Sequence, residues 1–97
     1  MLTRVIWARV EADRLVARRG VGFYGGELEA ASGGTATVVI RDGLGASAVA
    51  IYSFSAAASA LDRQALPFGI LIREGLFVDL GSNVSRFILY YDPTGQE

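Results

Sequence analysis

Apolar and polar residues alternate with a period of two along several short segments of this sequence. Such alternation is typical of a β-strand with one buried face, because successive side chains of a strand point to opposite sides. The segments are 35–41, 47–55, 68–72 and 76–80. The side chains predicted to face a core are Ala36, Val38 and Ile40 in the first segment; Ala48, Ala50, Tyr52 and Phe54 in the second; Phe68, Ile70 and Ile72 in the third; and Leu76, Val78 and Leu80 in the fourth. We expect each segment to be a strand.

Turn signals separate the alternating segments at intervals of about eight to twelve residues. They are Arg19-Gly20, Gly25-Gly26, Ser32-Gly33-Gly34, Arg41-Asp42-Gly43, Arg73-Glu74-Gly75, Gly81-Ser82-Asn83 and Asp92-Pro93-Thr94-Gly95. This spacing predicts an all-β fold, either a β-sandwich or a β-barrel. Because the turn at 73–75 joins two alternating segments, we also predict that 68–72 and 76–80 form a β-hairpin.

Two segments fit either a helix or a strand. We interpret residues 2–19 as two strands bent near Glu11-Ala12-Asp13, because β-branched and aromatic residues are concentrated at the start of this segment. A helix over the same residues is the alternative. Residues 55–66 have the alanine content of a short helix near 56–65, which Pro67 would end, and they fit an extended crossover between two sheets equally well.

The chain is expected to form one domain with three parts. Residues 1–19 would be a basic N-terminal pair of strands or an arm, residues 20–91 the β-sandwich core, and residues 92–97 a flexible C-terminal tail. The last strand, 87–91, is apolar on both faces, which is typical of a strand covered on both sides. Either a second chain supplies one of the covers, or the strand is central in the sandwich and its outer face tolerates tyrosine.

Composition narrows the chemistry that the chain supports. The 97 residues include no cysteine and no histidine, which excludes disulfides, thiolate zinc sites and cysteine nucleophiles and removes the commonest general base and metal ligand. Without histidine or lysine, none of the serines has an evident activating base. We therefore predict that the protein is not an enzyme, and we assign no catalytic, cofactor-binding or metal-binding residue.

Charge bears on the class of partner. The nine cationic side chains are all arginine, and with ten carboxylates they give a net charge of -1, so no positive field favours nucleic acid. No apolar run could span a bilayer and no secretory signal is evident, so we expect cytoplasmic synthesis and no membrane contact. Residues 1–19 hold five arginines and two acids, a charge of +3, and residues 20–97 hold four arginines and eight acids, a charge of -4. The basic segment would meet an acidic neighbouring subunit or be a solvated edge strand.

Three local motifs are better explained by structure than by chemistry. The segment 20–25, Gly-Val-Gly-Phe-Tyr-Gly, matches the dinucleotide-binding pattern, but the next glycine-rich turn follows too soon for the helix that this pattern requires. Glu27 and Glu29 share one strand face as a carboxylate pair, but a domain of this size rarely encloses a cleft between two acids. Asn83-Val84-Ser85 is a glycosylation sequon, which we interpret as a turn because no export signal accompanies it.

Six aromatic residues could build a platform for sugars or bases, although packing in a core or an interface is the default for aromatic side chains in strands. They are Trp7, Phe23, Tyr24, Tyr52, Tyr90 and Tyr91. Were one of them to stack on a sugar, we expect it to be an exposed Trp7 or Tyr24.

Five segments with hairpin signatures follow one another through most of residues 20–91. They are Gly22–Leu28, Ala36–Gly43, Leu66–Gly69, Glu74–Leu80 and Phe87–Tyr91. Together they resemble the small all-β virion proteins of tailed bacteriophages and related gene-transfer particles, namely capsid cement or decoration proteins and the base domains of head or tail fibres. The resemblance implies a compact single-domain antiparallel β-sandwich of a jelly-roll-like kind, with about seven or eight strands. It also implies that the protein is a homotrimer that sits between capsomers of the major capsid protein. The N-terminal segment has no counterpart in that pattern, and no catalytic residue carries over.

The function expected from this resemblance is that of a virion structural protein: an oligomeric cement or decoration protein, made in the host cytoplasm, that binds and stabilises the major capsid shell. The alternative is a carbohydrate-binding or host-recognition β-sandwich module of a fibre, with a sugar as ligand. For the first function we predict an oligomer interface at Phe87, Leu89, Tyr90 and Tyr91, and capsid contacts at Arg4, Arg9, Arg14, Arg18 and Arg19.

Overall fold

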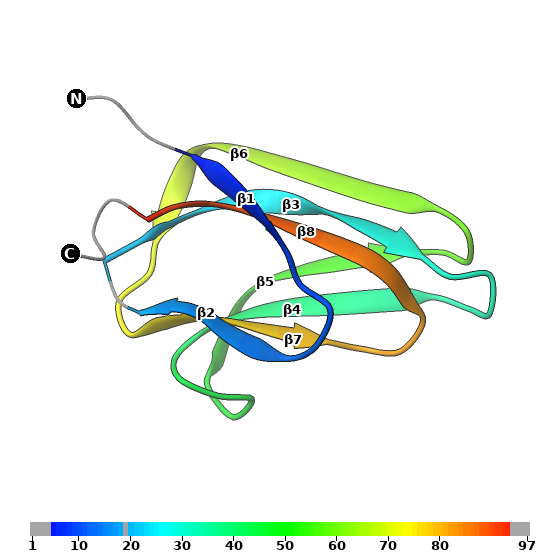
Figure 1. Cartoon of the computed structure of the whole chain (residues 1–97), viewed down its shortest axis with the longest axis horizontal. Helices are drawn as coiled ribbons and strands as arrows, with labels where there is room; N and C mark the ends of the chain where they lie inside the picture. Colours follow the sequence, from blue (N-terminus) through cyan, green and yellow to red (C-terminus); the bar gives the residue numbers. More distant parts are fainter. Residues whose placement is uncertain (1–4, 19, 94–97) are drawn as a thin grey trace.

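A computed structural model of the chain describes residues 5–18 and 20–93, and the structural statements below concern these residues. They contain eight strands and no helix: β1 (Ile6–Arg9), β2 (Arg14–Arg18), β3 (Gly22–Ala30), β4 (Ala36–Asp42), β5 (Val49–Ala56), β6 (Leu61–Leu71), β7 (Gly75–Leu80) and β8 (Val84–Asp92). Paired strands run antiparallel and form two sheets that face each other (Figure 1). The predicted all-β, antiparallel sandwich is therefore confirmed.

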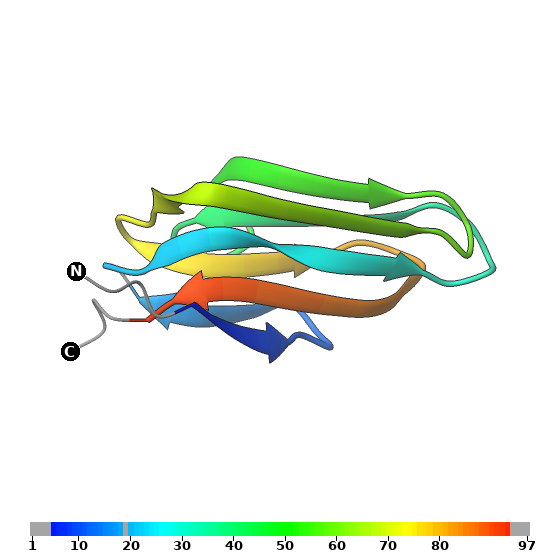
Figure 2. The same cartoon turned by 90° about the horizontal axis from the view of Figure 1, so that it is seen from above.

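The two sheets have the connectivity of a jelly roll. Sheet A has the strand order β1-β8-β3-β6, and sheet B has the order β2-β7-β4-β5. The first strand pairs with the last, the second with the second-last, and so on inward to β4 and β5, as if one long hairpin had been wrapped around a core. Figure 2 shows sheet A in front with its strands in this order and sheet B behind it.

The core fills the space between the sheets. Phe54 of sheet B lies edge-on to Phe87 of sheet A, with 5.1 Å between ring centres, and Phe23 and Tyr52 complete an aromatic cluster at 5.3 to 6.4 Å. Burial of each large apolar side chain stabilises the fold by about 1.5–3 kcal/mol. The largest fully buried side chains are Phe23, Phe54, Phe87, Leu28, Ile40, Ile72, Leu76, Leu89, Val10, Val21, Val38 and Val78. The predicted inward positions of 35–41 are confirmed, and Leu76 and Val78 are buried as expected.

The N-terminal segment forms two strands, of which β1 belongs to sheet A and β2 to sheet B. The chain crosses between the sheets through residues 10–13, where the strand prediction placed a bend. Val10 enters the core there, and the Asp13 carboxylate accepts a hydrogen bond from the backbone N–H of Leu80 at 2.8 Å. Within residues 5–18 the alternative of a helix is therefore wrong.

The predicted hairpin of 68–72 with 76–80 is wrong, because β6 lies in sheet A and β7 in sheet B. Residues 72–74 cross between the sheets instead of turning within one. The Asp42 carboxylate holds this crossing by accepting hydrogen bonds from the N–H groups of Arg73 and Glu74, at 3.0 and 2.8 Å, and from Gly75 at 3.4 Å. Burial raises the pKa of Asp42, but these backbone hydrogen bonds and the charge of Arg73 outweigh burial and leave that pKa below its usual value.

The short helix considered near 56–65 is also wrong. Residues 57–60 form a tight turn closed by a hydrogen bond from the N–H of Ala60 to the carbonyl of Ala57, and β6 begins at Leu61. Alanine has the highest helix propensity of all residues, but intrinsic propensity is a weak determinant of structure, and the pairing of β6 with β3 overrides it here. The described residues contain no helix that could cross a membrane.

Ala50 and Phe68 were predicted to face the core but are exposed, because each lies at a point where its strand has more residues than the paired segment of the neighbouring strand. Ile40 and Arg41 are consecutive on β4, but they pair with Tyr52 and Ala50 on β5, so Ile51 has no partner and Ala50 is exposed. On β6, Phe68 was expected in the core and is 92% exposed. A β-bulge of this kind redirects side chains without ending the strand.

Candidate functional site

The four residues predicted to form an oligomer interface lie on two different faces of β8. Phe87 and Leu89 are fully buried in the chain's own core, and Tyr91 packs against that core from the same side. These three side chains therefore face the interior of the sandwich, because the inner face of β8 is what completes the core. Tyr90 points to the outer face of sheet A, where it is half-buried.

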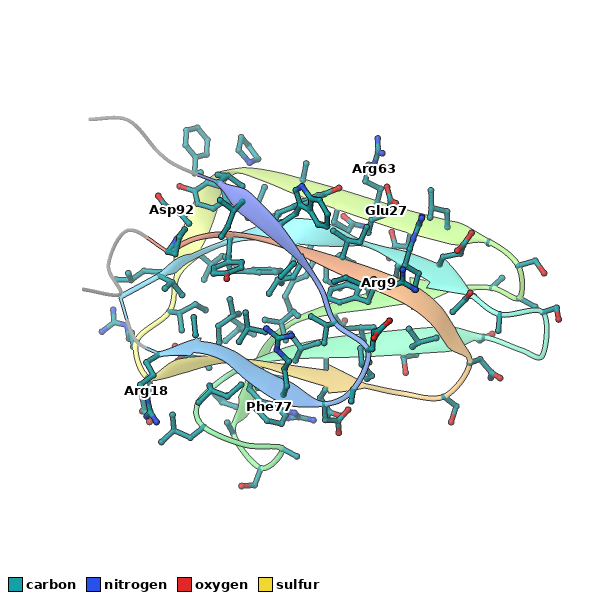
Figure 3. All side chains as sticks on the ribbon, in the orientation of Figure 1. Arg9, Arg18, Glu27, Arg63, Phe77 and Asp92 are labelled. Atoms are coloured by element: carbon teal, nitrogen blue, oxygen red, sulfur yellow. The ribbon has the colours of Figure 1, made fainter. Side chains whose placement is uncertain are left out.

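The five predicted capsid-binding arginines are not gathered on one sheet. Arg4 and Arg19 lie outside the described residues. Arg9 belongs to β1 of sheet A, where its Nε lies 3.3 Å from the Glu11 carboxylate, and Arg14 and Arg18 belong to β2 of sheet B. Figure 3 shows Arg9 and Arg18 far apart along the side of the sandwich where β1 and β2 are the edge strands.

Exposed apolar side chains are distributed unequally between the two sheets. Among the described residues, the exposed large hydrophobic side chains of sheet A are those of Ile6, Trp7, Leu61, Phe68 and Leu71, with Val5 directly before β1. Elsewhere only Leu44, in a loop, and Val49, on β5, belong to this class. Contiguous exposed apolar surface is typical of interaction sites. The outer side of sheet A and its two edges are therefore the candidate functional surface.

A row of residues in register crosses the outer face of sheet A. Trp7 of β1 lies opposite Tyr90 of β8, Tyr90 opposite Gly25 of β3, and Gly25 opposite Ala65 of β6. Directly opposed residues share a face of the sheet and have neighbouring side chains. The row, called here the aromatic row, thus places two aromatic side chains beside two small residues. Trp7 is 67% exposed.

The next row in register carries charge. Arg9 lies opposite Ile88, Ile88 opposite Glu27, and Glu27 opposite Arg63. We call these four residues the charged row. Glu27 is only 8% exposed, which is rare for a carboxylate unless it is paired.

Two arginines from different strands hold Glu27. Arg63 donates to one carboxylate oxygen at 2.9 Å and Arg86 to the other at 2.8 Å, and Figure 3 shows Arg63 extending outward above Glu27. The hydrogen bond and the charge of Glu27 raise the pKa of Arg63, whose guanidinium is cationic in any surroundings. The arrangement fixes the position of an exposed guanidinium beside the aromatic row.

A wide bulge of β6 lies next to these rows. Phe23 pairs with Ile70 and Gly25 with Ala65, so residues 66–69 of β6 face the single residue Tyr24. Gly69 has a φ of 69°, a left-handed conformation that other residues rarely adopt, and a Cβ there would lie 2.7 Å from the Tyr24 ring. The bulge turns Phe68 out to solvent beside a shallow hollow of about 170 Å³, lined by Gly22, Tyr24, Phe68, Gly69, Ile70 and Leu71.

The two hollows described on and beside this surface are small. The hollow at Phe68 and a second one of about 140 Å³ beside Arg9 and Arg86 are smaller than the roughly 300–1,000 Å³ of typical ligand pockets. Within residues 5–18 and 20–93, no group of three or more acidic side chains could hold a metal ion.

Sequence reasoning missed two of the residues that shape this surface. Glu27 was considered only as a partner of Glu29, because its arginine partners come from strands far away in sequence. Phe68 was assigned to the core by its alternation with Ile70 and Ile72. The signal that could have corrected this assignment is the pair Pro67 and Gly69 around it, since both residues mark an interruption in a strand.

Comparison with protein-family models, with curated proteins and with solved structures finds no match for this chain.

Proposed function

We propose that this protein is a structural component of a virus particle, an oligomeric cement or decoration protein whose outer face of sheet A contacts other polypeptides. The observation that supports the proposal best is the concentration of exposed apolar side chains on that sheet. Tryptophan, tyrosine and arginine dominate binding energy in protein interfaces, and Trp7, Tyr90 and Arg63 lie together there in two adjacent rows.

The jelly-roll connectivity is compatible with this role, since jelly rolls are common in viral capsid and lectin domains. A cement protein needs a rigid body and a contact surface, but no reaction. Its function would be to bridge neighbouring capsid subunits, so that separating the subunits also requires breaking the contacts with the bridge. The salt bridges of Glu27 with Arg63 and Arg86 hold these side chains in place. They therefore provide rigid anchors for a contact on this face.

The proposal predicts that a major capsid protein is encoded near this chain's gene, and the test is co-sedimentation with shells assembled from that protein. We expect the wild-type protein to sediment with the shells. The variant Arg9→Gln/Tyr90→Ala should bind at least about tenfold more weakly, which corresponds to about 1.4 kcal/mol. Phe77→Ala, on the outer face of sheet B, is the matched control and should bind as the wild type does. Equal binding by all three proteins would contradict the proposal.

A second candidate function has one observation in its favour. Trp7 is 67% exposed and lies beside Tyr90 and the charged row, so a sugar ring could stack on the indole while its hydroxyls contact arginine and carboxylate groups. Under this alternative the protein is a carbohydrate-binding or host-recognition module. A glycan array tests it: binding that Trp7→Ala abolishes would support a sugar site, and quenching of the single tryptophan by the bound glycan would locate it.

A further inference from the structure

We propose that copies of this chain associate head to tail, with the β1 edge of one subunit packed on the β6 edge of the next. The β1 patch consists of Val5, Ile6 and Trp7, and the β6 patch consists of Pro67, Phe68 and Leu71. This inference rests on the oligomeric part of the proposed function and does not depend on its capsid part.

The two patches lie on opposite edges of one sheet, at the same end of the molecule. Ile6 is in register with Tyr91, Tyr91 with Phe23, and Phe23 with Ile70, so one line across the sheet joins the β1 patch to the β6 patch. Figure 2 shows β1 and β6 as the two edge strands of sheet A, separated by β8 and β3. In one isolated molecule the patches therefore cannot cover each other.

The β6 patch is built by a departure from regular strand geometry. A regular strand would place Phe68 on the same face as Ile70, inside the sandwich, but the bulge at 66–69 and the left-handed Gly69 reverse it. The result is a phenylalanine that is 92% exposed and a leucine, Leu71, that is 63% exposed. Folding gains nothing from these two exposed side chains, whereas an interface gains a protruding aromatic anchor.

Strand direction favours continuation of sheet A from one subunit to the next. Neighbouring strands of β1-β8-β3-β6 are antiparallel, so β1 and β6 run in opposite directions. A second copy in the same orientation would thus bring its β1 antiparallel to β6 of the first. Pro67 lacks an N–H group and the bulge interrupts the strand, so the contact is made by side chains and not by a continuous backbone ladder.

The area of the contacting sides is sufficient for a stable interface. Figure 1 looks along the shortest axis, onto the side of the sandwich that carries the β1 edge, and this side spans 41 by 28 Å between Cα atoms. A standard interface buries about 800 Å² per partner, which fits within that side. A second copy of the chain is therefore a large enough occupant for each patch.

Head-to-tail symmetry covers both patches in every copy. A two-fold dimer that stacks the outer faces of two sheets would also pair unlike patches, but it stops at two copies, whereas a head-to-tail ring holds three or more. A heterologous interface joins the unlike patches, and a ring closes when the rotation between neighbours divides a full turn.

Cysteine cross-linking tests the pairing directly, because the chain has no cysteine of its own. We would prepare Val5→Cys and Leu71→Cys separately and treat each variant, and their equal mixture, with a short bis-maleimide. Head-to-tail packing predicts cross-linked dimers in the mixture and monomers only in each variant alone. Thr37→Cys and Ser53→Cys, exposed on sheet B, are the matched control pair and should not cross-link when mixed.

Sedimentation equilibrium adds a readout that does not depend on cysteine. Phe68→Ala should shift the mass from oligomer to monomer, and Leu44→Ala should leave the mass unchanged. Because Phe68 makes little contact in the isolated subunit, the melting temperature of Phe68→Ala should equal that of wild type diluted to the monomer. Self-cross-linking of a single variant, a wild-type monomer at all concentrations, or a dimer as the largest species would overturn the head-to-tail interface. A monomer that still sediments with capsid shells would overturn this inference and leave the proposed capsid binding intact. A head-to-tail oligomer that does not bind the shells would support this inference and contradict the proposed capsid binding.

Discussion

Trp7 of β1 lies directly opposite Tyr90 of β8 on the outer face of sheet A. The pair joins the first and last strands of the described chain, and the topology continues its row to Gly25 and Ala65 on the two remaining strands. The position of the single tryptophan at the edge of this row makes its fluorescence a direct probe of the surface.

Trp7 fluorescence is predicted to depend on protein concentration. In dilute solution the indole should emit like tryptophan in water and be quenched readily by acrylamide, because it is 67% exposed. On self-association the emission should shift to shorter wavelength and quenching should weaken. The measurement is a dilution series compared with Phe68→Ala, which should keep the water-exposed spectrum throughout. A wavelength that is already short in the monomer would contradict the exposure of Trp7.

Removal of the Glu27 carboxylate is predicted to destabilise the fold. Glu27→Ala leaves the partly buried Arg86 without its 2.8 Å partner, and the Nε of Arg86 already has no hydrogen bond. Loss of one partner of a buried ion pair costs about 3–5 kcal/mol, and we expect about 2–3 kcal/mol here because solvent reaches this pair. Urea unfolding gives the value. Arg63→Ala, which removes an exposed partner, should cost much less than Glu27→Ala; equal costs would contradict the central position of Glu27.

Stability is predicted to fall in acid because of Asp42. The pKa of Asp42 in the folded chain is lower than its ordinary value of 3.8, so the folded state favours the ionised carboxylate. The stabilisation is complete above the unfolded pKa and is lost as the pH falls through the lower, folded pKa. Unfolding free energies of wild type and Asp42→Asn should therefore differ by about 1–2 kcal/mol near neutral pH and converge as the pH falls below the lowered, folded pKa of Asp42. A constant difference across this range would rule out the assigned role.

Core packing is predicted to depend on the Phe54–Phe87 contact. Phe54→Ala removes a side chain that lies 5.1 Å from Phe87 and is 1% exposed, and such changes cost about 3–5 kcal/mol. Phe77→Ala, on the partly exposed outer face of sheet B, should cost about 1 kcal/mol. Thermal unfolding of the two variants compares them under the same conditions, and similar losses would contradict the placement of these two rings.

Alternation predicted the strands of this fold because the sandwich buries one face of each sheet. Ala36, Val38 and Ile40 follow that rule without interruption, and they are buried. The rule failed at β-bulges, at Ile51 and at 66–69, where one strand has more residues than the segment of the partner strand that it pairs with. A bulge depends on the neighbouring strand and leaves little signal in the local sequence. The turn at 73–75 was likewise read as a hairpin because sequence spacing alone does not distinguish a turn within a sheet from a crossing between two sheets.

The candidate surface was predictable only in part. Exposure of Trp7 was considered from the sequence, but its neighbour Tyr90 is brought beside it by the pairing of the first and last strands. Glu27 meets Arg63 and Arg86 through the order β8-β3-β6, which follows from jelly-roll connectivity and not from any local motif. The residues of β8 assigned to an interface were mixed with core residues, because a strand that is apolar on both faces does not reveal which face is inward.

The proposed function requires that other polypeptides cover the outer face of sheet A and its edges in an assembled particle. Oxidative footprinting of the free protein and of purified particles tests it most directly. We predict that Trp7, Phe68 and Tyr90 are strongly protected from oxidation in the particle, whereas Phe77 on sheet B is as reactive as in the free chain. Unchanged reactivity of Trp7 and Phe68 in a particle that contains the protein would contradict it.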